Sequence, residues 1–173
     1  MSTPAHQLAT QAIYNECLTY MSFAAMELGV SNSKAASGGN IALILVKSNG
    51  KEVWRQPAFS NSSSLPKAVK ADFSPSVPQA HLGMVGIPNG SQHANHTEPK
   101  LLDHFRSKLP SLRGVGYDEI IIASELDCCT SCVKNTISAI TALATLADMG
   151  SSTPLKFYVV EVNSGRVREG HEF

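Results

Sequence analysis

The sequence predicts an α/β domain built on a mixed sheet of about five strands. Three observations predict it: a long helix with an apolar stripe, two β runs joined by a tight turn, and two later strands separated by a helical pattern. At 173 residues, 43% of them hydrophobic, the chain is long enough to bury the core of one domain. We therefore expect residues 1–173 to form a single domain with the order α-β-β-α-β-α-β and a final antiparallel strand.

The N-terminal segment, residues 1–30, is predicted to form a helix over residues 4–28. Its apolar residues recur at spacings of three and four and make one stripe: Leu8, Ala12, Ile13, Cys17, Met21, Ala24 and Leu28. Thr3-Pro4 is suited to begin this helix and Gly29 to end it. Since free cysteine behaves as a small hydrophobe, we interpret Cys17 as core packing.

The first two strands are predicted to form a hairpin. Residues 41–47 are almost wholly apolar, which is typical of a central strand covered on both faces. Ser48-Asn49-Gly50 indicates the turn, and residues 52–58 the return strand. Pro57 is expected to mark where the return strand leaves the ladder.

Residues 59–93 form a segment rich in Ser, Pro, Asn and Gly, with a candidate short helix at residues 65–71. Loops of this length inside a domain are often functional. Because the segment ends at a histidine motif, we expect it to wall a pocket; the alternative is an insertion without a role.

The later elements alternate between helix and strand. Helices are predicted over residues 97–109, with Pro99 in the first turn, and over residues 129–149. Strands are predicted over residues 118–124 and 155–162, followed by a turn and a short strand near residues 166–169. The strand–helix–strand unit among them predicts right-handed connections in a mixed sheet.

Composition limits the classes of function. Basic and acidic residues balance at 14 each, which counts against a chain-wide polyanion-binding surface but not against a local basic groove. No apolar run is long enough to cross a membrane and no secretory signal is visible, so we expect action in the cytoplasm and no membrane partner. Cys128, Cys129 and Cys132 cluster while Cys17 stands alone, a pattern typical of a metal site in a reduced protein.

The chemistry of the chain is indicated by His96-Thr97-Glu98 and, further along, Cys129-Thr130-Ser131-Cys132. One imidazole and two thiolates make three ligands for zinc and leave the fourth tetrahedral position open for water. Both halves open a predicted helix, and Cys129 and Cys132 lie one turn apart on the same face. Glu98 is placed to move protons to and from that water rather than to bind the metal.

Other interpretations of this motif stay open. A closed structural zinc site would need a fourth protein ligand, which Cys128 or His93 could supply. Two other ligand spacings compete with this one: His93 with His96, and Cys128 with Cys132. Cys129 is preferred over Cys128 because its spacing to Cys132 fits one helical turn. The cysteines could also lie in a core without metal.

At these residues the chain resembles the cytidine deaminase-like superfamily, whose pattern is H-[AT]-E on one helix and P-C-x-x-C on the next. The resemblance covers residues 41–162, and residues 95–102 look most like nucleic-acid deaminase domains of bacterial polymorphic toxins. It implies a three-layer α-β-α fold, zinc held by His96, Cys129 and Cys132, and Glu98 as the proton shuttle. Cys128 stands where the family usually has proline, which leaves the cysteine register slightly open.

The same resemblance implies a substrate and partners. Such domains act on cytosine in DNA or RNA and are neutralised by an immunity protein, so we expect conversion of cytosine to uracil in a polynucleotide, DNA more than RNA, by a toxin delivered into another cell. We expect a monomer, because a polynucleotide needs an open groove. The alternatives are a free cytidine or nucleotide deaminase of salvage metabolism and a zinc-stabilised binding module without catalysis, against which the intact Glu98 argues.

Candidate substrate contacts follow from the base-recognition chemistry of such enzymes, in which the base stacks on an aromatic ring. Trp54 and Phe59 are the candidate rings, with core packing as the alternative for Trp54. Asn61 is the nearest match to the family's substrate-contacting asparagine and Asn40 is its rival, although either also fits an ordinary turn. His93 could flank the pocket.

A modest basic cluster surrounds the first motif helix: Lys100, Arg106, Lys108 and Arg113. Such a cluster could follow a phosphate backbone. It is equally typical of the solvated face of a helix.

Overall fold

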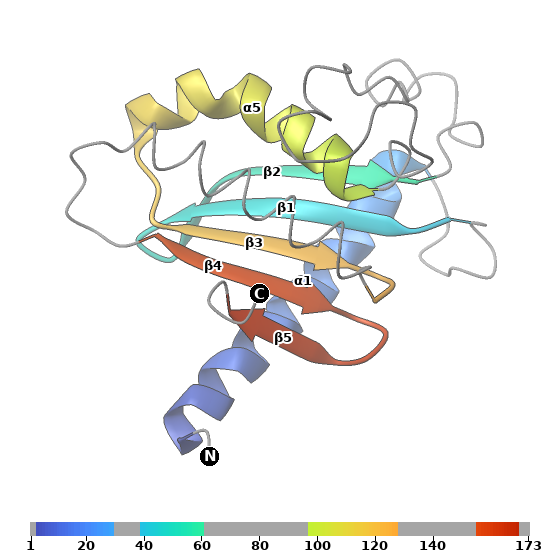
Figure 1. The fold of residues 1–173 in the computed structure, drawn as a ribbon, viewed down its shortest axis with the longest axis vertical. Helices are drawn as coiled ribbons and strands as arrows, with labels where there is room; N and C mark the ends of the chain where they lie inside the picture. The colour runs from blue at the N-terminus through green and yellow to red at the C-terminus, as the bar shows by residue number, and fades with distance from the viewer. Residues whose placement is uncertain (1–2, 30–38, 61–96, 128–154, 170–173) are drawn as a thin grey trace.

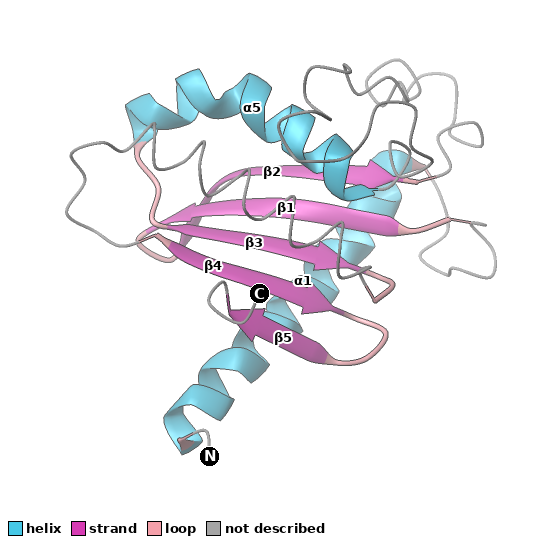
Figure 2. Ribbon diagram, viewed as in Figure 1, coloured by secondary structure: helices cyan, strands magenta, loops and turns pink. Residues whose placement is uncertain are grey.

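The computed structural model describes residues 3–29, 39–60, 97–127 and 155–169 (Figure 1). These residues form two helices, α1 (Pro4–Leu28) and α5 (Thr97–Val115), and five strands: β1 (Ile41–Ser48), β2 (Lys51–Phe59), β3 (Glu119–Ser124), β4 (Lys156–Glu161) and β5 (Arg166–Glu169) (Figure 2). The strands make one sheet in the order β2-β1-β3-β4-β5. β1 is antiparallel to β2 and β3, β3 is parallel to β4, and β5 is antiparallel to β4. The predicted mixed sheet of about five strands is therefore confirmed.

Each face of the sheet is covered by one of the two described helices (Figure 1). Ile44, Ile120 and Ile122 pack with the leucines and Phe105 of α5. Their neighbours Leu43 and Ile121 point to the opposite face and pack with α1. Because successive side chains of a strand alternate between faces, a strand covered on both faces must be apolar at nearly every position. This explains the continuous apolar runs that predict β1 and β3.

α1 begins and ends where the sequence predicts. Thr3 Oγ1 accepts a hydrogen bond from the His6 backbone N–H, and Gly29 adopts the left-handed conformation with φ 65°. Cys17, Met21, Ala24 and Leu28 of the predicted stripe are buried, but Leu8 is 73% exposed and Ala12 is exposed as well. Figure 1 shows the first turns of α1 extending past β5. The predicted apolar stripe is thus wrong at Leu8 and Ala12, because the helix is longer than the sheet that it crosses.

The hairpin between β1 and β2 has the predicted turn and a longer return strand. Asn49 and Gly50 both have positive φ, 50° and 76°, as a two-residue hairpin turn of the favoured hand requires. β2 continues through Pro57, which pairs with Leu43, so the expectation that Pro57 ends the strand is wrong. β2 is the outer strand of the described sheet, where a proline nitrogen facing outward breaks no ladder bond.

α5 runs beyond its predicted end at residue 109 and contains Pro110. The extension carries Leu112, which is buried in the core cluster on the α5 face. This burial offsets the hydrogen bond that proline removes from the helix. The predicted elements at residues 65–71 and 129–149 lie outside the described residues. Among the described helices, none has both the length and the apolar character needed to cross a membrane.

Phe105 gives a test of the core on the α5 face. Its side chain is fully buried, and its ring centroid lies 6.4 Å from that of Trp54 and 6.2 Å from that of Tyr117. We predict that Phe105→Ala lowers the free energy of unfolding by about 3–5 kcal/mol, because it leaves a cavity. Trp54 is the only tryptophan of the chain, so its fluorescence in a urea titration reports the transition.

The control for this measurement is Val115→Ala, since Val115 is 65% exposed at the end of α5. It should change the free energy of unfolding by about 0.5 kcal/mol or less. A loss below about 1 kcal/mol for Phe105→Ala would contradict the packing described.

Candidate functional site

Glu98 lies in the first turn of α5, at the edge of the sheet where β2, β3 and β4 end and β1 begins (Figure 1). Its side chain is buried, with 3% of the residue exposed. Thr97 Oγ1 donates a hydrogen bond to Glu98 Oε2 at 3.2 Å. The start of a helix favours a carboxylate, because its free backbone N–H groups and the helix dipole present positive charge there.

Asn40 joins the segments that meet at this edge. Its Nδ2 donates to Thr97 Oγ1 at 3.0 Å and to Ser124 Oγ at 2.8 Å, and its Oδ1 accepts from the Leu126 backbone N–H at 3.0 Å. The Asn40 backbone N–H donates to Ser60 Oγ at 2.7 Å, and its carbonyl accepts from Ser60 N at 3.0 Å. We call these five residues the polar corner: Asn40, Ser60, Thr97, Ser124 and Leu126.

The polar corner bears on which asparagine contacts a substrate. Both ends of the Asn40 side-chain amide are engaged by protein groups. This gives Asn40 a structural role, and a substrate contact by either Asn61 or Asn40 stays a prediction. Asn61 directly follows Ser60 in the sequence and lies outside the described residues.

The polar corner also joins the two segments that lie next to the two halves of the zinc motif. Thr97 directly follows His96, and Leu126 comes three residues before Cys129. One amide side chain therefore holds together two segments that lead to predicted ligands. In the described ranges no group of three or more His, Cys, Asp or Glu residues could hold a metal ion. All three predicted zinc ligands, His96, Cys129 and Cys132, lie outside these ranges, as do His93 and Cys128.

Lys100 is buried against the end of β2. Only 3% of the residue is exposed, and its Nζ donates to the Phe59 carbonyl at 2.6 Å and lies 3.5 Å from the Ser60 carbonyl. Burial lowers the pKa of Lys100 from its ordinary 10.5 to about 8. The expectation that Lys100 belongs to a solvent-facing basic cluster is therefore wrong. Lys108 and Arg113 are exposed on α5.

The two candidate aromatic platforms both have packing roles. Phe59 is fully buried in the cluster beneath α1, and a Cβ on Gly39 would lie 2.9 Å from its ring. Trp54 is partly buried against the cluster on the α5 face. It pairs with Val46 near the hairpin turn, about 16 Å along the strand from Phe59. In the described structure, a base could reach the ring of Phe59 only if the cluster around it opened.

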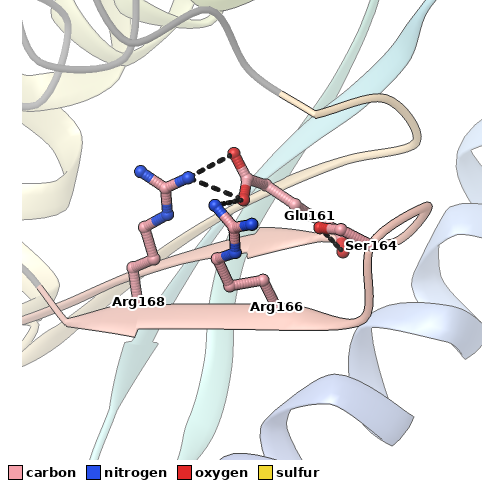
Figure 3. Close-up of polar contacts among 4 residues, drawn as sticks. All are labelled: Glu161, Ser164, Arg166 and Arg168. Carbon is pink, nitrogen blue, oxygen red and sulfur yellow. Dashed lines mark hydrogen bonds and ion pairs between the residues drawn. The ribbon is translucent and has the colours of Figure 1, made fainter.

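Glu161, at the end of β4, binds two arginines of β5 (Figure 3). Arg168 Nη2 lies 3.1 Å and 3.3 Å from the two carboxylate oxygens, and Arg166 Nη1 lies 3.6 Å from Oε2. The Glu161 side chain is 1% exposed and that of Arg166 is 54% exposed. Glu161 is in register with Ser124, and the alternation of side chains puts both on the α5 face. Glu161 and its two arginines therefore lie beside the Ser124 end of the polar corner.

Sequence reasoning assigned no role to Ser60, Thr97, Ser124 or Leu126 of the polar corner, and it missed the burial of Lys100. Two of these residues could have been found from the sequence. Thr97 is a short hydroxyl residue between the His and Glu of the motif, and Ser124 is the polar last residue of an apolar strand. Nothing in the sequence indicates that Lys100 is buried, because its partners are carbonyls of another element.

No family model matches the chain, and neither a curated protein nor a solved structure is significantly similar to it. Its function is therefore inferred from its own residues and their geometry.

The buried amine of Lys100 predicts a pH-dependent stability. Its pKa is about 8 in the folded chain and takes the ordinary 10.5 when unfolded, so the unfolded chain binds more protons between these values. The free energy of unfolding therefore rises with pH across this range, by at most about 3 kcal/mol. The gain is complete above pH 10.5, shrinks as the pH falls from 10.5 toward 8, and is gone below about 8.

The measurement is the difference in free energy of unfolding between the wild type and Lys100→Met, from urea titrations across this pH range. Taking the difference cancels the other titrating groups, such as Cys17, whose pKa burial raises to about 12. A difference that does not change with pH would contradict a buried, titrating Lys100.

Proposed function

We propose that this chain is a zinc-dependent hydrolytic deaminase that converts cytosine to uracil in a polynucleotide, DNA in preference to RNA. The observation that carries the proposal is the buried Glu98 at the start of α5, beside an asparagine that bridges the segments leading to both halves of the zinc motif. The mixed sheet with a helix on each face is compatible with the three-layer cytidine deaminase-like arrangement, which forms part of the proposal.

His96, Cys129 and Cys132 would hold the zinc ion. One imidazole and two thiolates suit zinc and leave one tetrahedral position for water. When bound, zinc supplies a water whose pKa is lowered toward about 7. The hydrogen bonds of Asn40 to Thr97 and Leu126 support this ligand set, because they join the segment that follows His96 to the segment that leads to Cys129.

Glu98 would move the protons of the reaction. Water adds at C4 of the cytosine and ammonia leaves, which requires one proton to pass to the ring nitrogen and one to the leaving amine. Thr97 already holds Oε2 of the Glu98 carboxylate, which leaves Oε1 to take and deliver these protons. Burial of Glu98 keeps bulk water away from the transfer.

An exposed arginine near the same edge supports a polyanionic substrate. Arg166 is in register with Glu161, which is in register with Ser124, so Arg166 lies two strands, or about 10 Å, from the polar corner. Lys108 and Arg113 are also exposed, but they lie about 16 Å and 24 Å along α5 from Thr97, toward the opposite edge of the sheet. Local cations can bind phosphates although the chain carries no net charge.

The proposal includes a monomer that acts in the cytoplasm of a target cell as a delivered toxin, with an immunity protein as its partner.

The role of Glu98 is tested by Glu98→Gln. We predict that this variant keeps bound zinc and the wild-type melting temperature but loses turnover by about 100-fold or more, because the amide cannot accept the proton. Zinc is measured by atomic absorption and turnover by chromatography of the product. Glu52→Gln, at an exposed position of β2, is the matched control and should retain activity. Wild-type turnover in Glu98→Gln would remove Glu98 from the mechanism, and loss of zinc would make it a ligand instead.

The substrate is tested by incubating the protein with single-stranded DNA, duplex DNA, RNA, cytidine and adenosine. We expect uracil to appear in DNA, detected by sequencing, and DNA binding to weaken as salt concentration rises. Turnover of free cytidine alone would favour a salvage enzyme. Bound zinc without any product would indicate the non-catalytic binding module.

A further inference from the structure

The direction of the hydrogen bonds around Asn40 is fixed by one backbone group. The Leu126 N–H can only donate, so the Asn40 side-chain atom 3.0 Å from it must be the oxygen. The NH₂ end of the amide therefore faces Thr97 Oγ1, at 3.0 Å, whereas Ser124 Oγ lies 2.8 Å from Nδ2 and 3.2 Å from Oδ1. Since an NH₂ group can only donate, Thr97 Oγ1 must be the acceptor in its bond with Asn40.

The Thr97 hydroxyl then has one proton left to donate. Glu98 Oε2 lies 3.2 Å away and is in position to accept it. Thr97 is 1% exposed and Glu98 is 3% exposed, so bulk water does not compete for this bond. The donors therefore run in one direction, from Asn40 to Thr97 to the Glu98 carboxylate.

We propose that Asn40 and Thr97 form a hydrogen-bond relay that orients the Glu98 carboxylate, which makes both of them positioning residues. The relay holds Oε2, and Oε1 would then take the reacting proton. Hydrogen bonds to a carboxylate in a buried setting are strong, and successive bonds reinforce one another. Asn40 also binds Leu126, so the same side chain sets Glu98 relative to the segment leading to the cysteines. This inference rests on the proposed function, in which Glu98 is the proton shuttle.

The test compares two substitutions of Thr97. Thr97→Val keeps the shape and removes the hydroxyl, whereas Thr97→Ser keeps the hydroxyl. We expect Thr97→Val to lower kcat by about 10- to 100-fold, with KM within about twofold and zinc content unchanged. Thr97→Ser should restore kcat to within about threefold of the wild type. A merely structural role of Thr97 would not produce this recovery together with an unchanged KM.

Asn40→Asp tests the first bond of the relay. The carboxylate still accepts from the Leu126 N–H but has no donor for Thr97. The Thr97 proton can then turn toward residue 40 and away from Glu98. We expect kcat to fall to about the level of Thr97→Val, again without loss of zinc.

Ser107→Ala is the matched control on the same helix. It removes an exposed hydroxyl whose 2.7 Å bond is to the His104 carbonyl, away from the relay. Its kcat should stay within about twofold of the wild type. The relay is overturned if Thr97→Val keeps the kcat of this control, or if Thr97→Ser fails to restore kcat.

A measurement without substrate separates the relay from the proposed function. A buried, bonded hydroxyl proton exchanges slowly with water, so NMR of threonine-labelled protein should show one such resonance that disappears in Thr97→Val and shifts in Glu98→Gln. If the folded wild type lacks this resonance, the relay is overturned whatever the activity. If the resonance is present, the relay stands, and absence of deamination of every substrate then overturns the proposed function alone.

Discussion

The hydrogen bonds of Asn40 are the constraint on which the candidate site depends. β1 is bonded on both edges and covered on both faces, so the residue before it stands where the ends of several elements converge. Buried polar groups at such a point are costly unless each finds a partner. In the polar corner, both ends of the Asn40 side-chain amide and both backbone groups of Asn40 have hydrogen-bond partners. The positions of β2, β3 and α5 around Glu98 are therefore set together.

The contrast between the sheet and its edge explains why chemistry is expected at the edge. The sheet interior is filled by Ile, Leu and Val from the two central strands, which leaves no place for a polar reaction. Strand ends and helix starts carry backbone groups without ladder partners, and short polar side chains satisfy them. Here these side chains also surround a buried carboxylate. The rigid sheet and α5 thus hold Glu98 in a fixed frame, which general acid–base chemistry requires.

Much of the fold could be predicted from the sequence, because its signals are local. The apolar runs of β1 and β3, the Asn49-Gly50 turn and the caps of α1 each depend on a few adjacent residues. The errors at Pro57, Pro110 and Leu8 arose because their causes lie in other elements. Pro57 is tolerated at the edge of the sheet, the helix continues past Pro110 because Leu112 is buried, and Leu8 lies beyond the width of the sheet. Lys100 was missed for the same reason. Glu98 and Asn40 could be shortlisted, but only the structure shows the bonds between them, and zinc binding by His96, Cys129 and Cys132 stays a prediction.

The sequence separation of the bonds in the polar corner has a consequence for folding. The β1–β2 hairpin closes locally, whereas the bonds from Asn40 to Thr97, Ser124 and Leu126 span 57, 84 and 86 residues. Contacts between distant parts of a chain form late, since the entropy of closing the loops must be lost first. We expect the hairpin to nucleate early and Glu98 to reach its final environment among the last steps. A nascent or partly unfolded chain would then lack the proposed activity, which would arise only when the sheet is complete.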